Sequence, residues 1–294
     1  MPGKPYFQFN WAGHFLDMGQ TTRIMGIVNI TPDSFSDGGR FIDPQAALSH
    51  AEKMVEEGAD IVDIGGESSR PFSDSVPEEE EIKRVVPVIS ALAKHISIPI
   101  SIDTTKARVA RKALDAGASI INDISALRQD PDMAKVVAES KVPVILMHML
   151  GTPKNMQKSP AYQNVVGEIR DFLRNAIRSA MDKGIDGSKI IIDPGIGFGK
   201  TFDHNFLLLK HIHEFLDLNV PVLVGPSRKA FIRNKLSEIE NKAPLPDSLP
   251  VETGTQAAVA ACGLSGIHIV RCHNVANTRA TLKIIDEIRN ACPG

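Results

Sequence analysis

Polar side chains close a series of short apolar runs along this 294-residue chain. Eight runs of this kind can be counted, and the residue that ends each one could donate a hydrogen bond, accept one or carry charge. The closing residues are Asn29, Asp63, Asp103, Asn122 with Asp123, His148, Asp193, the segment 225–227, and Arg271 with His273. Packing alone does not require so many carboxylates and amides at these positions, and the last run ends in two basic residues. The set therefore predicts a polar site that also holds an anion.

The basic end consists of Arg271 and His273, two donors that alternate along the end of a buried run. A buried charge is costly unless it is paired, so an anion is the simplest partner. The whole chain has 33 Lys and Arg against 35 Asp and Glu, so it lacks a field that would collect nucleic acid or an anionic membrane. Any anionic ligand must therefore be held by a few local cations or backbone N–H groups, which favours a small phosphorylated molecule over a polymer.

Structural roles compete for several of these positions. An Asp or Asn after a strand often caps a helix or orders a turn. We interpret Asp123 as a cap and Asp63 as an acceptor that orders the GGESSRP turn. A single histidine such as His148 more often packs than catalyses. The same holds for the histidines expected on helical surfaces, which are His50, His95, His204, His211 and His213.

Each apolar run is rich in β-branched residues and precedes a segment of helical periodicity. The predicted strands are RIMGIVN, DIVDIG, IPISID, SIIND, PVILMH, KIIID, PVLVG and GIHIVR. One predicted helical stripe comprises Val165, Ile169, Phe172, Leu173, Ala176, Ile177 and Ala180. Continuous apolar strands indicate a parallel sheet, and eight βα units predict an α/β fold, the closed (βα)8 TIM barrel. A doubly wound open sheet remains the alternative, because strand count does not prove closure.

We expect residues 1–22 to form an N-terminal extension across the bottom of the barrel, and residues 23–294 to form the barrel as a single domain. The proline-rich stretch 243–250 predicts a loop between helices. The N-terminus lacks the apolar region of a signal peptide, and no run approaches the ~18 residues that cross a bilayer. The cysteines Cys262, Cys272 and Cys292 form no C-x-x-C pair, so a reducing cytoplasm is expected.

Eight strings in order carry a resemblance to a known family. They are MGIVNITPDSFSDGG, VDIGGESSRP, SIDTTKARVA, IINDISAL, MHMLGTPKNMQ, IDPGIGFGKT, GPSRKAFI and IVRCHNV. Together they span about residues 23–280, and the chain resembles the dihydropteroate synthases. The resemblance implies a cytoplasmic, homodimeric transferase of folate biosynthesis that uses Mg2+, takes small-molecule substrates and is a target of sulfonamides.

The reaction implied by this resemblance displaces pyrophosphate from the methylene of 6-hydroxymethyl-7,8-dihydropterin by the aryl amine of p-aminobenzoate. A buried site can read the pterin edge by matched hydrogen bonds, because an unmatched one costs ~1–3 kcal/mol. The resemblance assigns the pterin to Asp103, Asn122, Asp193, Lys229, Met147 and Phe198. Of these, Met147 and Phe198 would face the flat ring, although both could simply belong to the core.

The leaving pyrophosphate needs positive groups and a metal, because its charge grows as the C–O bond breaks. The resemblance assigns this region to Asn29, Arg271 and His273, with Asn29 as the Mg2+ ligand. Positive charge on the methylene spreads into the ring, where Asp103 would stabilise it. The expected catalytic residues are therefore Asp103, Lys229, Asn29, Arg271 and His273.

Two loops rich in turn residues, 31–40 and 68–77, are expected to move over the mouth and complete the p-aminobenzoate pocket. Phe35, Ser69, Arg70 and Pro71 would line this pocket. Ser227 and the stem of Lys229 would form its floor.

The chain departs from the family pattern at three positions. Ser69 stands where threonine is usual, Phe72 where glycine is common, and Asn274 where aspartate is typical. The first change keeps a hydroxyl and should be nearly silent. Phe72 could reshape the second loop and Asn274 removes a charge beside the anion site, so substrate affinity and drug sensitivity are the properties in question.

Two other functions remain open on the sequence. A methyltetrahydrofolate-dependent methyltransferase would share a similar pterin floor, but it would not need the two loops or the Arg-x-His element. A pterin-binding protein without turnover is the second alternative, and the intact Asn29, Lys229, Arg271 and His273 argue against it.

Overall fold

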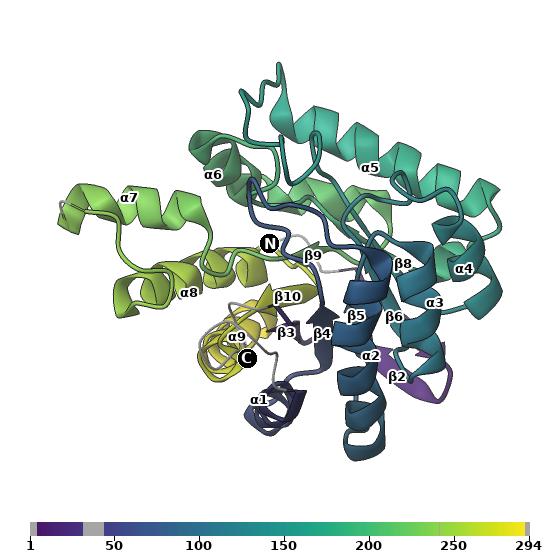
Figure 1. The fold of residues 1–294 in the computed structure, drawn as a ribbon. Coiled ribbons are helices and arrows are strands. Elements are labelled where there is room, and N and C mark those ends of the chain that lie inside the picture. The colour runs from purple at the N-terminus through teal and green to yellow at the C-terminus, as the bar shows by residue number, and fades with distance from the viewer. Residues whose placement is uncertain (1–4, 32–43, 241, 292–294) are drawn as a thin grey trace.

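The computed structural model describes residues 5–31, 44–240 and 242–291, and these form a barrel of eight parallel strands ringed by helices (Figure 1). The barrel strands are β3 (Arg23–Asn29), β4 (Ile61–Gly65), β5 (Ile100–Asp103), β6 (Ile120–Asp123), β7 (Val144–Met147), β8 (Ile190–Asp193), β9 (Leu223–Val224) and β10 (Ile269–Cys272). Their order is β8-β7-β6-β5-β4-β3-β10-β9. A parallel bridge between Ile192 and Val222 joins the two ends. The doubly wound open sheet is therefore excluded.

The strands form where apolar residues run without interruption. Every residue of β4, β6, β7 and β8 is buried, because side chains on one face fill the barrel and those on the other pack under helices. All eight predicted strings coincide with these strands. This agreement confirms the predicted (βα)8 architecture.

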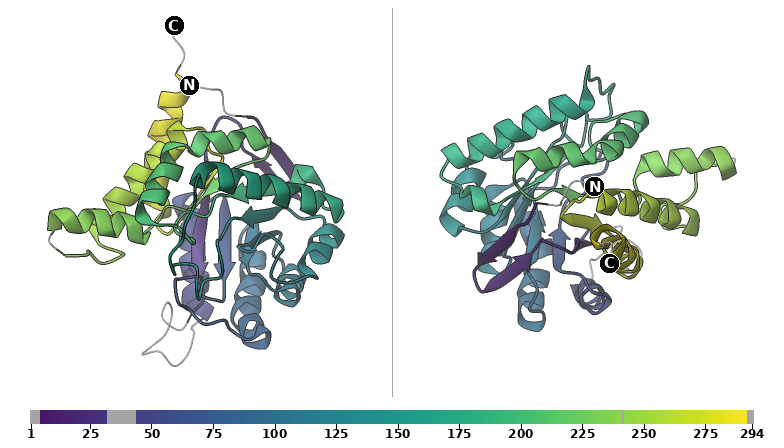
Figure 2. Two further views of the ribbon diagram at one scale, coloured as in Figure 1. Left: turned by 90° about the horizontal axis from the view of Figure 1, so that it is seen from above. Right: turned by 180° about the vertical axis from the view of Figure 1, so that it is seen from behind.

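The helices cover the outside of the barrel. They are α1 (Pro44–Glu57), α2 (Glu78–His95), α3 (Ala107–Asp115), α4 (Met133–Ser140), α5 (Val165–Asp182), α6 (Phe202–Lys210), α7 (Ala230–Glu240), α8 (Leu249–Leu264) and α9 (Val275–Asn290), with short 3-10 helices at Gly187–Lys189 and Ile212–Leu218. The stripe predicted for α5 lies toward the barrel, with Val165, Ile169, Leu173 and Ala180 fully buried. Helices α7 and α8 extend sideways from the rest (Figures 1 and 2). None of the described helices is both long and apolar enough to cross a membrane.

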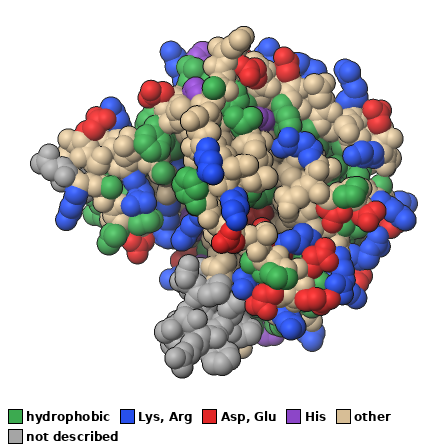
Figure 3. All heavy atoms as spheres, turned by 45° about the horizontal axis from the view of Figure 1, so that its top comes forward, with side chains coloured by type: hydrophobic (Ala, Val, Ile, Leu, Met, Phe, Trp, Pro, Cys, Tyr) green, Lys and Arg blue, Asp and Glu red, His purple; other side chains and the backbone are tan. Residues whose placement is uncertain are grey.

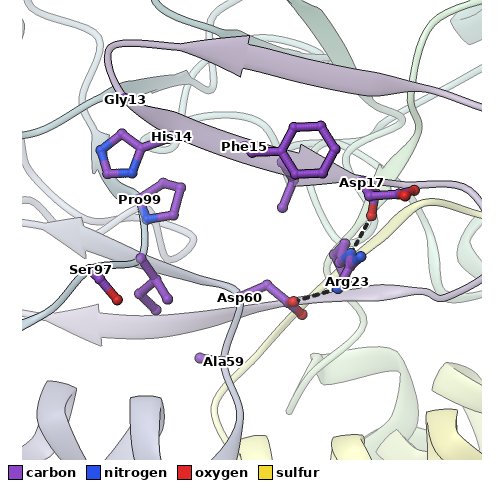
Figure 4. A pocket seen from close by; sticks show the side chains of 11 residues that line it. Gly13, His14, Phe15, Asp17, Arg23, Ala59, Asp60, Ser97 and Pro99 are labelled. Atoms are coloured by element: carbon purple, nitrogen blue, oxygen red, sulfur yellow. Dashed lines mark hydrogen bonds and ion pairs between the residues drawn. The ribbon is translucent and has the colours of Figure 1, made fainter.

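A β-hairpin, β1 (Gln8–Trp11) and β2 (His14–Asp17), lies at the amino-terminal ends of the barrel strands. The indole N–H of Trp11 donates to the carbonyl of Ser119, directly before β6, at 2.7 Å. Arg23 pairs with Asp60 at 2.9 Å and also bonds the carbonyl of Asp17 (Figure 4). The charged side chains of Arg23 and Asp60, between the hairpin and the barrel, are thus already paired with one another. The polar side chains that could take part in a reaction lie at the opposite, carboxyl-terminal end of the strands.

Candidate active site

A pocket opens at the carboxyl ends of the strands, where side chains from different βα units meet. It is lined by Ser69, Asp103, Asn122, Ile124, Met147, Asp193, Ile196, Phe198, Gly225, Lys229 and Arg271. All six residues assigned to the pterin from the sequence are in this set. They converge because each lies at the end of a parallel strand or in the loop that follows it.

A network of ion pairs and one hydrogen bond links four strands at the base of the pocket. Arg271 on β10 donates from Nε to Asp63 Oδ2 at 2.6 Å and from Nη2 to Asp103 Oδ2 at 2.8 Å. The Nδ2 group of Asn122 donates to the same Asp63 oxygen at 3.1 Å. Asp63 is completely buried, and the side chain of Arg271 is 17% exposed. One cation is thus shared by two buried carboxylates.

This network corrects the interpretation of Asp63. We expected Asp63 to order the GGESSRP turn, but its carboxylate binds Arg271 and Asn122. The physical reason is its place in the middle of β4, where every residue is buried and a carboxylate needs a partner inside the barrel. A buried charge needs a partner, which holds for Asp63 as it does for Arg271.

The network also sets the protonation of Asp103. Burial raises the pKa of Asp103 to about 7, with the charge of Arg271 opposing the shift and that of Asp63 adding to it. For Arg271, burial lowers the pKa, but the charges of Asp63 and Asp103 outweigh it and the pKa rises. Arg271 therefore stays charged, while Asp103 changes protonation near neutral pH.

Lys229 and Asp193 form the opposite side of the pocket. The Nζ atom of Lys229 lies 4.0 Å from the ring centroid of Phe198, a cation–π contact. Burial and the repulsion of Arg271 lower the pKa of Lys229 to about 8. The Asp193 carboxylate accepts the backbone N–H of Gly195 at 2.7 Å, and burial raises its pKa.

The glycines of the DPGIGFG segment make room for this arrangement. A Cβ atom at Gly197 would lie 2.9 Å from Cδ of Lys229, and φ there is +86°. The backbone thus passes directly beneath the lysine stem, which requires a residue without a side chain.

An apolar wall completes the pocket. Ile124, Met147, Met149, Met156 and Phe198 form a buried cluster that is separate from the main core. Flexible methionine side chains fill irregular space beside a flat ring. The wall can therefore face an aromatic ligand whose polar edge points to Asp193 and Asn122.

Lys200 was not among the site residues predicted from the sequence. It is completely buried, and its Nζ group lies 3.0 Å from Nδ1 of His148 and 2.8 Å from the carbonyl of Phe198. Burial lowers the pKa of Lys200 to about 7 and that of His148 to about 2, so the imidazole is a neutral acceptor. His148 also packs edge-on against Phe172, in keeping with the packing role expected for it. The sequence feature that could have pointed to Lys200 is its position directly after the glycine-rich DPGIGFG segment.

The residues expected at pyrophosphate lie at the ends of β3 and β10. His273 Nδ1 is 2.9 Å from Ser227 Oγ, and burial together with the charges of Arg228 and Arg271 lowers the pKa of His273 to about 3. The imidazole is therefore a hydrogen-bonding group at neutral pH and contributes no positive charge. Asn274 accepts the N–H of Asn277 and caps α9, a role for which Asn and Asp are equally suited.

Asn29 ends β3, in register with Gly65 on β4. Within the described residues, no group of three His, Cys, Asp or Glu side chains could hold a metal. A single amide oxygen suits Mg2+, which keeps several waters and relies on substrate phosphate. The amide oxygen of Asn29 is therefore chemically suited to be one ligand of Mg2+.

The second loop reaches the pocket through Ser69. Ser73 Oγ donates to the carbonyls of Ser68 and Arg70 at 2.5 and 2.8 Å, and the N–H of Phe72 donates to the carbonyl of Pro153 at 2.9 Å. Arg70 and Pro71 are exposed at the rim. Of the first loop, Thr31 is described, while residues 32–40, including Phe35, lie outside the described residues.

Phe72 adopts a φ of 67°, in the left-handed region that favours glycine. Phe72, one of the three departures from the family pattern, thus lies where the backbone angle favours glycine, the residue that is common in the family. The phenyl group is 62% exposed, so its ring gains little from packing.

Comparisons with known proteins agree with this geometry. The family described as pterin binding enzyme matches residues 25–273. The dihydropteroate synthase of Synechocystis sp. is 44% identical over 272 residues, covering 92% of each chain. Among solved structures, the Yersinia pestis dihydropteroate synthase with a sulfonamide drug complex has a TM-score of 0.88 and 40% identity, covering 97% of this chain and 100% of that one. The Xanthomonas albilineans dihydropteroate synthase with 4-aminobenzoic acid has a TM-score of 0.87 and 42% identity, with coverage of 98% and 100%.

Proposed function

The chain belongs to the dihydropteroate synthase family of pterin-binding enzymes, and we propose that the mouth of its barrel divides into pterin, pyrophosphate and p-aminobenzoate regions. It is a transferase that joins 6-hydroxymethyl-7,8-dihydropterin pyrophosphate to p-aminobenzoate, giving 7,8-dihydropteroate and pyrophosphate. The observation that carries this assignment is the convergence of Asp103, Asn122, Asp193, Met147, Phe198 and Lys229 on one pocket.

The pterin lies between the apolar wall and the polar edge of the pocket. Asp193 accepts from the aminopyrimidine N–H groups, Asn122 and Asp103 bind the neighbouring edge, and Lys229 donates to ring acceptors. Met147 and Phe198 face the ring. A ligand that lacked one of these hydrogen bonds would leave a buried group unmatched, at a cost of about 1–3 kcal/mol.

Asp103 assists the bond exchange at the methylene carbon. The C–O bond breaks with its electron pair remaining on pyrophosphate. The lone pair of the aryl amine forms the new C–N bond, and the nitrogen then loses a proton to solvent. The ionised carboxylate of Asp103 stabilises the positive charge that spreads into the ring. The amine is already a neutral nucleophile at pH 7, so its positioning contributes more than a base would.

Arg271, His273 and Asn29 hold the pyrophosphate. The two bonds of Arg271 to Asp63 and Asp103 use two of its five N–H donors, and the others can reach a phosphate oxygen. The neutral imidazole of His273 adds a hydrogen bond, and Asn29 would hold Mg2+. When bound, Mg2+ neutralises the charge that develops on the leaving group.

The p-aminobenzoate lies under the second loop. Ser69, Arg70 and Pro71 line its region, Phe35 is assigned to it from the sequence, and Ser227 with the stem of Lys229 forms the floor. The guanidinium of Arg70 is a suitable partner for the benzoate carboxylate. Sulfonamides share the shape of p-aminobenzoate, so we expect them to compete for this region, with inhibition that added p-aminobenzoate relieves.

We further propose that the enzyme is a homodimer of the cytoplasm. The α7–α8 pair and its connecting segment expose Ile239, Leu245 and Leu249 at 78%, 70% and 77%. Exposed apolar side chains on one projecting element favour association.

The surface charge and the cysteines fit the other expectations about partners and compartment. The face drawn in Figure 3 mixes Lys and Arg with Asp and Glu, which gives no basic patch there for a nucleic acid. Cys262 and Cys272 are free and buried, in keeping with a reducing compartment.

The test is pyrophosphate release on mixing the purified protein with dihydropterin pyrophosphate, p-aminobenzoate and Mg2+. We expect stoichiometric dihydropteroate, and a loss of turnover in Asp193→Asn. Tight pterin binding without product in a single-turnover experiment would favour the binding protein, and no release under any condition would refute the synthase.

A further inference from the structure

An ion cluster that is largely shielded from solvent lies outside the pocket, between the second loop and two helices. The Nζ group of Lys106 is 2.5 Å from Oε2 of Glu67 and 2.5 Å from Oε2 of Glu81. The side chains of Lys106, Glu67 and Glu81 are 14%, 21% and 1% exposed. Nothing in the proposed reaction uses these three residues.

Glu67 connects the beginning and the end of the second loop. Its Oε2 atom accepts from Lys106 and also from the backbone N–H of Val76, at 2.7 Å. Residues 67 and 76 flank the segment that contains Ser69 and Arg70. One carboxylate oxygen therefore closes the base of the loop.

Glu81 and Lys106 tie this base to the barrel. Glu81 lies in the first turn of α2, and a Cβ atom at Gly66 would lie 3.0 Å from its Cγ, so the loop base rests directly on that turn. Lys106 stands between β5 and α3, three positions after Asp103. The cluster thus fixes the loop relative to the strand that carries a pterin-pocket residue.

The other end of the loop is held more weakly. The exposed pair of Lys154 and Asp74 has side chains that are 75% and 84% exposed, and such pairs contribute little. Phe72 donates one backbone hydrogen bond to Pro153. The ion cluster, together with the hydrogen bond from Arg84 Nη1 to the Gly66 carbonyl at 2.9 Å, therefore fixes the base of the loop that carries Ser69 and Arg70.

We propose that Lys106 is a positioning residue for the p-aminobenzoate region, acting through Glu67 and Glu81. The inference rests on the proposed role of the second loop in holding p-aminobenzoate. A displaced loop would misplace the amine relative to the methylene, and a shift of about 1 Å can cost on the order of 100-fold in rate. The pterin pocket, built from strand ends, would keep its geometry.

The experiment compares Lys106→Met with Arg108→Met. Arg108 also joins α3 to the first turn of α2, through Glu78 and Glu79, but it is 53% exposed and does not touch the loop. We expect Lys106→Met to raise KM for p-aminobenzoate about tenfold or more. Pterin pyrophosphate affinity, measured by calorimetry, should change less than about twofold, and Arg108→Met should leave both values unchanged.

Two further variants keep the test decisive. Glu67→Gln retains the bond to Val76 but weakens the pairing with Lys106, so it should show the same selective rise if Lys106→Met fails to fold. Lys106→Arg restores the charge and should recover part of the p-aminobenzoate affinity. Equal losses for both substrates, or no rescue by arginine, would show a merely structural role.

Ser69→Ala separates failure of this inference from failure of the proposed function. If Ser69→Ala raises KM for p-aminobenzoate and Lys106→Met does not, the positioning role is wrong and the loop assignment stands. If neither variant changes that KM, the loop assignment itself is wrong and the inference falls with it.

Discussion

Substitution of Arg271 by methionine would leave two carboxylates inside the barrel without their shared cation. Asp63 is completely buried and Asp103 is 12% exposed, so solvent cannot replace the guanidinium. Removing one partner of a buried ion pair costs about 3–5 kcal/mol. We therefore expect Arg271→Met to lower the free energy of unfolding by about 3–5 kcal/mol at pH 8.

The loss should depend on pH in a defined direction. Without Arg271, the folded-state pKa of Asp103 rises further above the unfolded value of about 3.9, because the charge of Arg271 no longer opposes the effect of burial. The folded state then binds more protons than the unfolded state, so stability falls as pH rises. Each further unit of pKa shift contributes about 1.4 kcal/mol, so the deficit should shrink by at least about 1 kcal/mol at pH 6.

Urea unfolding at the two pH values measures this, with the fluorescence of the buried Trp11 and circular dichroism as probes. Arg111→Met is the matched control, because its 2.9 Å pair with Glu139 is exposed to solvent and should contribute little to stability. A loss below about 1 kcal/mol at pH 8, or the same loss at both pH values, would refute the reasoning.

Three other predictions follow from the site. Because Lys229 loses its charge as pH rises through about 8 and Asp103 gains its charge through about 7, kcat/KM should peak between these values, and a flat profile from about pH 6 to 9 would contradict this. Phe72→Gly should be about 0.5–1 kcal/mol more stable than Phe72→Ala, because glycine alone suits the left-handed φ, and equal thermal unfolding of the two would disprove strain there. Lys229→Ala should weaken pterin binding about tenfold or more in calorimetry, whereas Asn29→Ala should mainly reduce turnover and change its Mg2+ dependence. Equal losses in both properties for both variants would show that the roles are wrongly divided.

The strands could be predicted because a strand buried on both faces has a continuous apolar sequence. RIMGIVN and GIHIVR, at opposite ends of the chain, pair in the structure as β3 and β10. Closure of the barrel depends on the bridge between Ile192 and Val222, which lie in different strings. The local sequence pattern indicates which strands are buried, but it does not indicate which two edge strands pair to close the barrel.

The pterin side of the site was predictable because a parallel barrel brings all its strand ends to one rim. Asp103 and Asn122, for example, lie in register on neighbouring strands. The partners of each side chain were not predictable. The sharing of Arg271 between Asp63 and Asp103 depends on the direction of side chains across the barrel, which sequence spacing does not give.

Two lysines that are shielded from solvent were the hardest residues to find. Lys106 and Lys200 occur in strings that supported the resemblance, but their partners Glu67 and His148 are distant in sequence. Phe72 was noticed only as a departure, and the reason for its importance is a backbone angle.

Asp193 and Asn122, at the carboxyl end of the barrel, are proposed to bind the polar edge of the pterin. A crystal structure with pterin pyrophosphate, Mg2+ and a p-aminobenzoate mimic would test this binding mode. We predict ring nitrogen atoms within hydrogen-bonding distance of both side chains, with the pyrophosphate toward Arg271 and His273. A pterin bound elsewhere, for instance in the pocket beside the β1–β2 hairpin, would rule out this site.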